Sequence, residues 1–150
     1  SYALDAARST GLPILVGFSC KLGNDGATVL LLGFQGGQDI TLAQGLELLT
    51  GTEVELVAIM HTLPEDTTAP LKEVLQHWQG AVGVYPHSGS FTANDLQFQH
   101  KPISPTAFLA RAREWVKIGV QAVGGCCGIG PEHIKLLREE LPGLSPPHEI

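Results

Sequence analysis

The segment GVQAVGGCCGIGPEHIKLL, residues 119–137, contains a short apolar run, a glycine-rich loop and a helical pattern, in that order. The apolar run covers 120–125 and predicts a short strand. Pro131 predicts the first turn of a helix, on which Ile134 and Leu137 share one face. A strand, a loop and a helix in this order form the unit from which α/β folds are built.

The same order occurs three more times along the chain. The other apolar runs cover 13–19, 54–60 and 81–85. A hairpin is expected after the first run, turning at the Asn-Asp-Gly of residues 24–26. We expect the remaining helices at 41–49 with Thr41 as its cap, at 66–79, and from Ser104 and Pro105 onward, the last with an apolar stripe of Phe108, Leu109, Ala112, Trp115 and Val116. A long polar loop is expected after 81–85, and an irregular tail at 142–150.

These patterns predict an α/β fold with four parallel strands. The runs are nearly all apolar rather than alternating, which is typical of parallel strands covered on both faces. Four such units are half of a (βα)8 TIM barrel, which needs roughly 250 residues, and we expect residues 1–150 to form one half-barrel domain. A small doubly wound sheet is the structural alternative. Residues 2–11 read as the end of a preceding helix closed by Gly11, and the only methionine is Met60, so a longer parent chain is expected.

Composition narrows the classes of partner. The net charge is −6 and the pI is about 5.4, and no basic cluster occurs, which argues against nucleic acid or an anionic membrane as a partner. No apolar run approaches the roughly 20 residues of a membrane span, and no leader pattern is visible. Three cysteines do not make a disulfide framework. The expectation is a reduced, cytoplasmic chain.

Candidate functional residues follow the predicted strands directly. Sites in parallel sheets form beyond the carboxyl ends of the strands. The residues at those ends are Cys20 after the first run, His61 and Thr62 after the second, Tyr85, Pro86, His87 and Ser88 after the third, and Cys126 and Cys127 after the fourth. The other histidines, His77, His100, His133 and His148, fall away from these ends and are predicted to be solvated surface residues.

The adjacent cysteines Cys126 and Cys127 allow several interpretations. A disulfide between neighbouring residues is strained, and two inert buried thiols are an alternative. A redox pair is a weaker interpretation, because the spacing is not Cys-x-x-Cys. The flanking glycines and the start of the next helix favour thiolates that approach a ligand. Two thiolates and a third protein ligand would hold zinc with one open position, which is the catalytic pattern.

The sequence resembles the homocysteine S-methyltransferase family, which includes the betaine-dependent enzymes. The resemblance is strongest at GGCCG, 124–128, and PEHI, 131–134. VGFSC at 16–20 and VYPHSG at 84–89 resemble two further family segments, the second with His in place of Asn. The resemblance runs from about residue 12 to about 141 and covers the carboxyl-terminal half of a family member.

The resemblance implies a zinc ion held by three cysteines inside a (βα)8 barrel. Cys126 and Cys127 are two of these ligands, and His61 stands where the third cysteine is expected. Cys20 is a reserve third ligand and otherwise lines the pocket. The expected substrate-binding residues are Cys20, Thr62, Tyr85 and Ser88.

The implied reaction is methyl transfer to a small thiol, homocysteine, giving methionine. The donor would be a sulfonium or quaternary ammonium compound or a folate, with S-methylmethionine as the first choice. Half a barrel leaves open strand edges, so we expect either a complementary amino-terminal half or a second copy of the chain. The alternatives are an inactive half-barrel that binds metal or ligand, and the redox protein.

Overall fold

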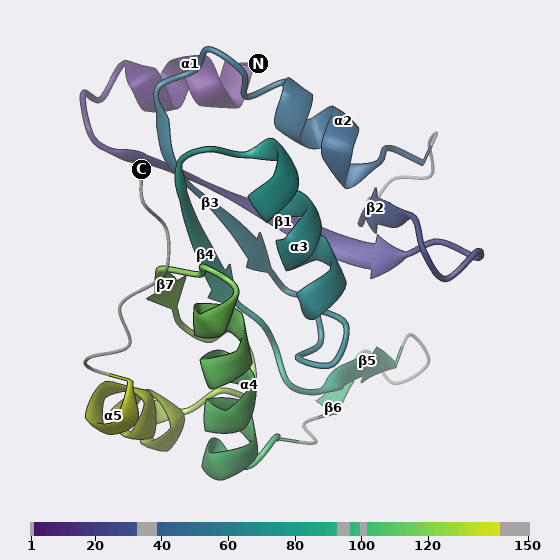
Figure 1. The fold of residues 1–150 in the computed structure, drawn as a ribbon, viewed down its shortest axis with the longest axis vertical. Coiled ribbons are helices and arrows are strands. Elements are labelled where there is room, and N and C mark those ends of the chain that lie inside the picture. Colours follow the sequence, from purple (N-terminus) through teal and green to yellow (C-terminus); the bar gives the residue numbers. More distant parts are fainter. Residues whose placement is uncertain (1, 33–38, 93–96, 100–101, 142–150) are drawn as a thin grey trace.

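The computed structural model describes residues 2–32, 39–92, 97–99 and 102–141, and shows a five-stranded sheet flanked by helices (Figure 1). The strand order is β2-β1-β3-β4-β7. Four strands are parallel and follow one another across the sheet in chain order: β1 (Ile14–Leu22), β3 (Val54–Met60), β4 (Ala81–Tyr85) and β7 (Ala122–Val123). The short β2 (Val29–Leu31) pairs antiparallel with the end of β1.

The described part of the chain contains α1 (Tyr2–Arg8), α2 (Leu42–Glu47), α3 (Thr68–His77), α4 (Pro105–Lys117) and α5 (Pro131–Glu140). Helices α2 to α5 contribute buried side chains to one hydrophobic core cluster, and α1 packs against this cluster through the half-buried Leu4 and Ala7. On the sheet, alternate residues of β3 and β4 face this core, because successive side chains of a strand point to opposite faces. Val57, Ile59, Val82 and Val84 are all at most 1% exposed. Figure 1 shows α3 and α4 on the same side of the sheet.

The opposite face of the sheet carries a row of small side chains. Gly17, Ala58, Gly83 and Ala122 are register partners on four neighbouring strands, so they form one row across this face. A hollow of about 350 Å³ lies over part of the row and reaches Gly124 and Gly125. Leu15, at the rim of the hollow, is 65% exposed. The sheet therefore has one face covered by helices and one open face, within the residues that the structure describes.

This arrangement tests the predicted fold class. An α/β fold with four parallel strands alternating with helices is confirmed. A doubly wound sheet carries helices on both faces, whereas the described helices share one core. The strand order and the single covered face are compatible with part of a TIM-barrel-like domain.

Local sequence signals explain most of the element boundaries. Thr41 caps α2: its hydroxyl accepts a hydrogen bond from the N–H of Gln44, whose side chain accepts one from the N–H of Thr41. The Ser104 hydroxyl accepts the N–H of Ala107 at the start of α4. Five side chains on one stripe of α4 are buried, as predicted: Phe108, Leu109, Ala112, Trp115 and Val116. The hairpin turn is held by Asp25, whose carboxylate accepts the N–H groups of Ala27 and Thr28.

Two elements differ from the prediction. The expected long polar loop contains a small hairpin, β5 (Ser90–Thr92) and β6 (Gln97–Gln99). Each strand has three residues and is mostly polar, so the sequence contains no periodic pattern there. Only the backbone pairing of the two strands identifies them. β7 covers only Ala122 and Val123 of the run 120–125, and its last bond to β4 runs from the N–H of Gly124 to the carbonyl oxygen of Val84. The predicted tail 142–150, His100 and His148 lie outside the described residues.

The helices that the structure describes include none with both the length and the apolar character that a bilayer crossing requires.

Candidate functional site

The ends of β4 and β7 are joined by backbone hydrogen bonds. The N–H of Cys126 donates to the carbonyl oxygen of Pro86 at 2.9 Å, and the N–H of Ser88 donates to the carbonyl oxygen of Cys127 at 2.8 Å. Gly128, with φ of +77°, follows directly, and a Cβ at this position would overlap the carbonyl oxygen of Ser88. The loop after β7 therefore packs against segment 86–88 with no space for a side chain at 128.

The ends of β3 and β4 are joined as closely. The N–H of His87 donates to the carbonyl oxygen of Thr62 at 3.2 Å. The rings of His61 and His87 lie against one another, with centroids 4.5 Å apart. His61 has φ of +47°, a left-handed conformation that is uncommon for residues other than glycine. Segment 86–88 thus lies between His61 on one side and the cysteine pair on the other.

His87 is kept neutral by its surroundings. Its pKa lies below the ordinary value, first because burial disfavours the imidazolium and second because His61 is adjacent. Hydrogen bonds to the backbone of His61 and Gly89, and the charge of Glu65, act in the opposite direction.

The two adjacent cysteines are free thiols with their sulfur atoms 3.8 Å apart. Cys126 is half-buried and Cys127 is exposed. The Cys126 thiol, through its hydrogen bond and its charge, raises the pKa of Cys127. Two thiolates at tetrahedral positions, each about 2.3 Å from zinc, are about 3.8 Å apart. The pair therefore has the sulfur separation of two zinc ligands without rearrangement.

His61, the third predicted ligand, does not form a three-residue cluster with the two cysteines. Among the residues that the structure describes, no three histidine, cysteine or carboxylate side chains are gathered into a metal-binding cluster. The cysteine pair fits two positions of a zinc site, and the role of His61 stays a prediction.

Cys20 and Thr62 brace the ends of β1 and β3. The Thr62 hydroxyl accepts the N–H of Cys20 at 3.1 Å and donates to the carbonyl oxygen of Met60 at 2.9 Å. Thr62 is 3% exposed and Cys20 is part of the hydrophobic core. Burial raises the pKa of the Cys20 thiol to about 12, with a further contribution from the charge of Glu73. Their predicted contact with substrate stays a prediction.

Tyr85 lies on the open face of the sheet. Its hydroxyl donates to the sulfur of Met60 at 2.9 Å, and a Cβ at Gly17 would overlap that hydroxyl. Burial raises the pKa of Tyr85, and the neighbouring Cys126 adds to the shift. Tyr85 also lines the hollow that reaches Gly124 and Gly125. Of the predicted substrate-binding residues, Tyr85 is the one that lines this hollow beside the cysteine loop.

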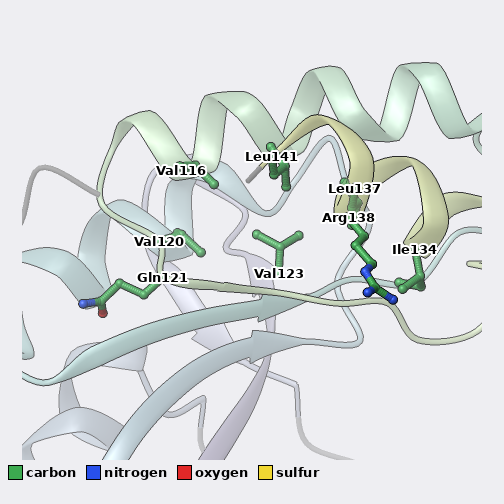
Figure 2. A pocket seen from close by; sticks show the side chains of 8 residues that line it. All are labelled: Val116, Val120, Gln121, Val123, Ile134, Leu137, Arg138 and Leu141. Carbon is green, nitrogen blue, oxygen red and sulfur yellow. The ribbon is translucent and has the colours of Figure 1, made fainter. Parts of the chain in front are cut away.

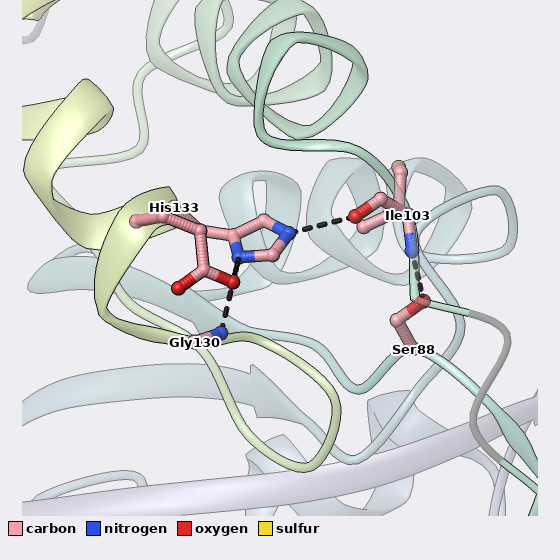
Figure 3. Close-up of polar contacts among 5 residues, drawn as sticks. Ser88, Ile103, Gly130 and His133 are labelled. Atoms are coloured by element: carbon pink, nitrogen blue, oxygen red, sulfur yellow. Dashed lines mark hydrogen bonds and ion pairs between the residues drawn. The ribbon is translucent and has the colours of Figure 1, made fainter.

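His133 is a correction to the sequence analysis. It was predicted to be a solvated surface histidine, but it is 2% exposed. Its ring accepts the N–H of Gly130 at Nδ1 (3.1 Å), and its Nε2 is 2.7 Å from the carbonyl oxygen of Ile103 (Figure 3). Ile103 in turn donates its N–H to the hydroxyl of Ser88, which is buried. The third position of a helix is where a side chain can reach back to the N-cap backbone, which accounts for the bond to Gly130 but gives no signal for burial.

A separate hollow of about 290 Å³ lies on the helix side of the sheet (Figure 2). Its walls come from the end of α4, the segment leading into β7, and α5, and they are mostly apolar, with Gln121 and Arg138 as the polar members. Val123 of β7 points into it (Figure 2), and the register of the strands places this side chain on the face opposite to the row that contains Ala122. This hollow is not part of the site at the strand ends.

The comparison with protein families agrees with the motifs. A sequence model of the family described as homocysteine S-methyltransferase matches residues 1–141. Among solved structures, the chain is similar to the homocysteine methyltransferase MmuM from Escherichia coli in its oxidized form, with 26% sequence identity and a TM-score of 0.48. That match covers 67% of this chain and 30% of the other, so the chain spans less than a third of that structure.

Proposed function

Because the chain belongs to the homocysteine S-methyltransferase family, we propose that it forms part of an enzyme that methylates the sulfur of homocysteine. The observation that carries the proposal is the pair Cys126 and Cys127, whose sulfurs are 3.8 Å apart at the carboxyl end of the parallel sheet. In the reaction, the thiol loses its proton and its sulfur forms a bond to the donor methyl carbon. The bond from that carbon to the donor breaks, and its electron pair stays with the leaving thioether or amine. The products are methionine, the demethylated donor and a proton, which is released to solvent.

The proposed metal ligands are Cys126, Cys127 and His61, which leave one position open. Thiolates and imidazole are the donors that zinc prefers. Bound there, zinc would supply the positive charge that favours a thiolate over a thiol near neutral pH. His61 is proposed as the third ligand because it follows β3 at the edge of the sheet where the cysteine loop begins; its ring packs against His87, so binding requires the ring to move toward the cysteine pair.

The remaining residues position the substrate and the loop. Tyr85 and Gly124 line the hollow on the open face, which is the proposed path of the thiol to the cysteine pair. The backbone N–H of Ser88 holds the cysteine loop through its bond to Cys127. We place Ser88 on the side of the site where the methyl donor would bind. Thr62 and Cys20 keep the ends of β1 and β3 together beneath it. Alignment of thiol and methyl donor is the main contribution that such a scaffold makes.

A partner is part of the proposal. The β2 strand pairs with β1 only from Cys20 to Leu22, so residues 14–18 of β1 have a strand neighbour on one side within the described chain. An unpaired edge and an open apolar face both favour the addition of further strands. We propose that the chain is the carboxyl-terminal half of a (βα)8 barrel, closed by an amino-terminal half or by a second copy.

The test measures methionine formation from homocysteine and S-methylmethionine. The chain is assayed alone and with a polypeptide that supplies the amino-terminal strands of a family member, and zinc content is determined by elemental analysis. Activity in either mixture that is lost in Cys126→Ala and Cys127→Ala, and kept in the exposed-histidine variant His77→Ala, supports the proposal. Stoichiometric zinc without methionine formation in any mixture would favour an inactive metal-binding half-barrel instead.

A further inference from the structure

The loop that carries the cysteine pair is part of a closed ring of hydrogen bonds. The ring starts at Cys127, whose carbonyl oxygen accepts the N–H of Ser88 at 2.8 Å. The Ser88 hydroxyl accepts the N–H of Ile103 at 2.7 Å. The carbonyl oxygen of Ile103 bonds to Nε2 of His133, and Nδ1 of His133 accepts the N–H of Gly130 (Figure 3). The chain from Gly130 back to Cys127 closes the ring.

The partners of His133 fix its protonation state. A backbone N–H only donates, so Nδ1 is the acceptor and carries no proton. Nε2 therefore carries the proton and donates it to the carbonyl oxygen of Ile103. The carboxylate of Glu132 lies 3.3 Å from Nδ1 but is itself exposed to solvent. The buried ring is the neutral tautomer with its proton on Nε2.

The surroundings hold the ring in one orientation. His133 is 2% exposed, and its ring packs edge-on against Phe108 of α4 at a centroid distance of 5.8 Å. Reorienting the ring would break both hydrogen bonds inside a dry environment, where unsatisfied polar groups are costly. His133 thus links α4, α5 and the segment after β4 at one point.

We propose that His133 is a positioning residue for the cysteine pair, acting through Gly130 and through Ser88. Its Nδ1 anchors the far end of loop 126–130, and its Nε2 anchors Ile103, which holds the Ser88 that bonds to Cys127. The inference rests on the proposed function in one respect, because that function makes the cysteine pair the metal and thiol site. The positions of the cysteines and their hydrogen bonds do not depend on turnover. A histidine that only filled space would not need either ring nitrogen.

Three substitutions distinguish a positioning role of His133 from a role that only fills space. His133→Asn keeps an acceptor near the place of Nδ1, His133→Gln keeps a donor near the place of Nε2, and His133→Leu keeps bulk without either. The matched control is His77→Asn, an exposed histidine at the end of α3.

The measurement is the rate of iodoacetamide alkylation at each cysteine of the full native chain, followed by peptide mass spectrometry without metal, homocysteine or methyl donor. Cys20 is an internal control for folding, because it is buried and its pKa is raised to about 12. We expect His133→Leu to speed alkylation of the half-buried Cys126 roughly fivefold, the change in open population that follows loss of one ordinary hydrogen bond. Cys20 should stay protected, and the rates for His133→Asn and His133→Gln should both lie between those of the parent chain and His133→Leu.

Unchanged alkylation of Cys126 and Cys127 in a His133→Leu chain that still protects Cys20 would overturn the proposal. If His133→Leu exposes Cys20, the comparison of the two polar variants decides. Rates for His133→Asn and His133→Gln that are both as fast as that for His133→Leu would then overturn it. The alkylation assay contains no substrate, so its outcome does not depend on whether the proposed methyl transfer is correct.

Discussion

The imidazole ring of His61 lies against that of His87, with centroids 4.5 Å apart and planes inclined by 35°. This contact joins the ends of β3 and β4 at the side of the sheet where the cysteine loop also begins. Two imidazolium ions at this distance would repel one another, and partial burial of His87 disfavours its charge further. The surroundings of His87 therefore favour its neutral form.

Stability should fall on acidification because of His87. Its pKa in the folded chain is below the ordinary value of 6.5, so below that pH the unfolded chain binds a proton that the folded chain does not. The free energy of unfolding should consequently decrease as the pH falls from about 6.5 toward 5. Urea unfolding at pH 7.5 and pH 5.5 measures this. His87→Asn should lose part of the pH dependence, whereas His77→Asn should keep all of it; equal slopes in the two variants would contradict the assignment.

Residue 61 should affect metal affinity. His61→Cys replaces a neutral imidazole by a thiolate, which adds one negative charge to the proposed ligands and should strengthen zinc binding. His61→Ala should weaken it. Competition with a chromophoric chelator measures both, with His77→Ala as the control. Identical zinc affinity in all three variants would remove residue 61 from the ligand set.

Gly128 should be intolerant of a side chain. Gly128 and Gly26 have similar positive φ angles, +77° and +68°, but a Cβ meets the carbonyl oxygen of Ser88 at Gly128 and nothing within 4 Å at Gly26. Gly26→Ala should cost only the conformational penalty of about 1 kcal/mol. Gly128→Ala should cost about 2–4 kcal/mol, since the loop must also move away from Ser88. Chemical denaturation of both variants checks the difference, and equal losses would show that the loop moves freely.

The cysteines should differ in reactivity. Cys20 is buried, and its pKa of about 12 keeps it protonated at pH 8, where a thiolate is needed for reaction. A disulfide reagent at pH 8 should therefore modify Cys126 and Cys127 in the native chain, and Cys20 only after denaturant is added. Rapid modification of Cys20 in the native chain would contradict its burial in the hydrophobic core.

Acid should loosen the first hairpin before the rest of the sheet. Hydrogen bonds from Thr28 and Ala27 lower the pKa of Asp25 to about 2. The carboxylate contributes stability above its ordinary pKa of 3.8, and this contribution is lost as the pH falls from about 4 through 2. Amide exchange at Ala27 and Thr28 should rise over this range in the parent chain. Asp25→Asn should show fast exchange already at neutral pH.

The sequence allowed the strands and the positions of the candidate residues to be predicted, because both depend on local patterns. The apolar runs 54–60 and 81–85 coincide with β3 and β4, and residues after successive parallel strands meet because such strands end at one edge. The structure brings 61–62, 86–88 and 126–127 side by side for this reason.

Burial of single polar residues could not be predicted in the same way. His133 lies on the first turn of α5, a place that local pattern assigns to solvent. It is buried because α4 and the segment at Ile103 pack over it, and both contacts come from residues about 25 to 30 positions away. Such contacts depend on tertiary packing, which periodicity does not describe.

The row of Gly17, Ala58, Gly83 and Ala122 determines what any covering element must look like. Tyr85 and Met60 occupy the space over Gly17, and Leu56 lies beside Gly83. The vacant space is the hollow over Ala58, Gly83 and Ala122. Tight interiors alternate large residues with small ones. The strands that complete this sheet should therefore point bulky aliphatic or aromatic side chains at positions 58, 83 and 122, and a candidate counterpart that offers only alanine and glycine there would leave a void.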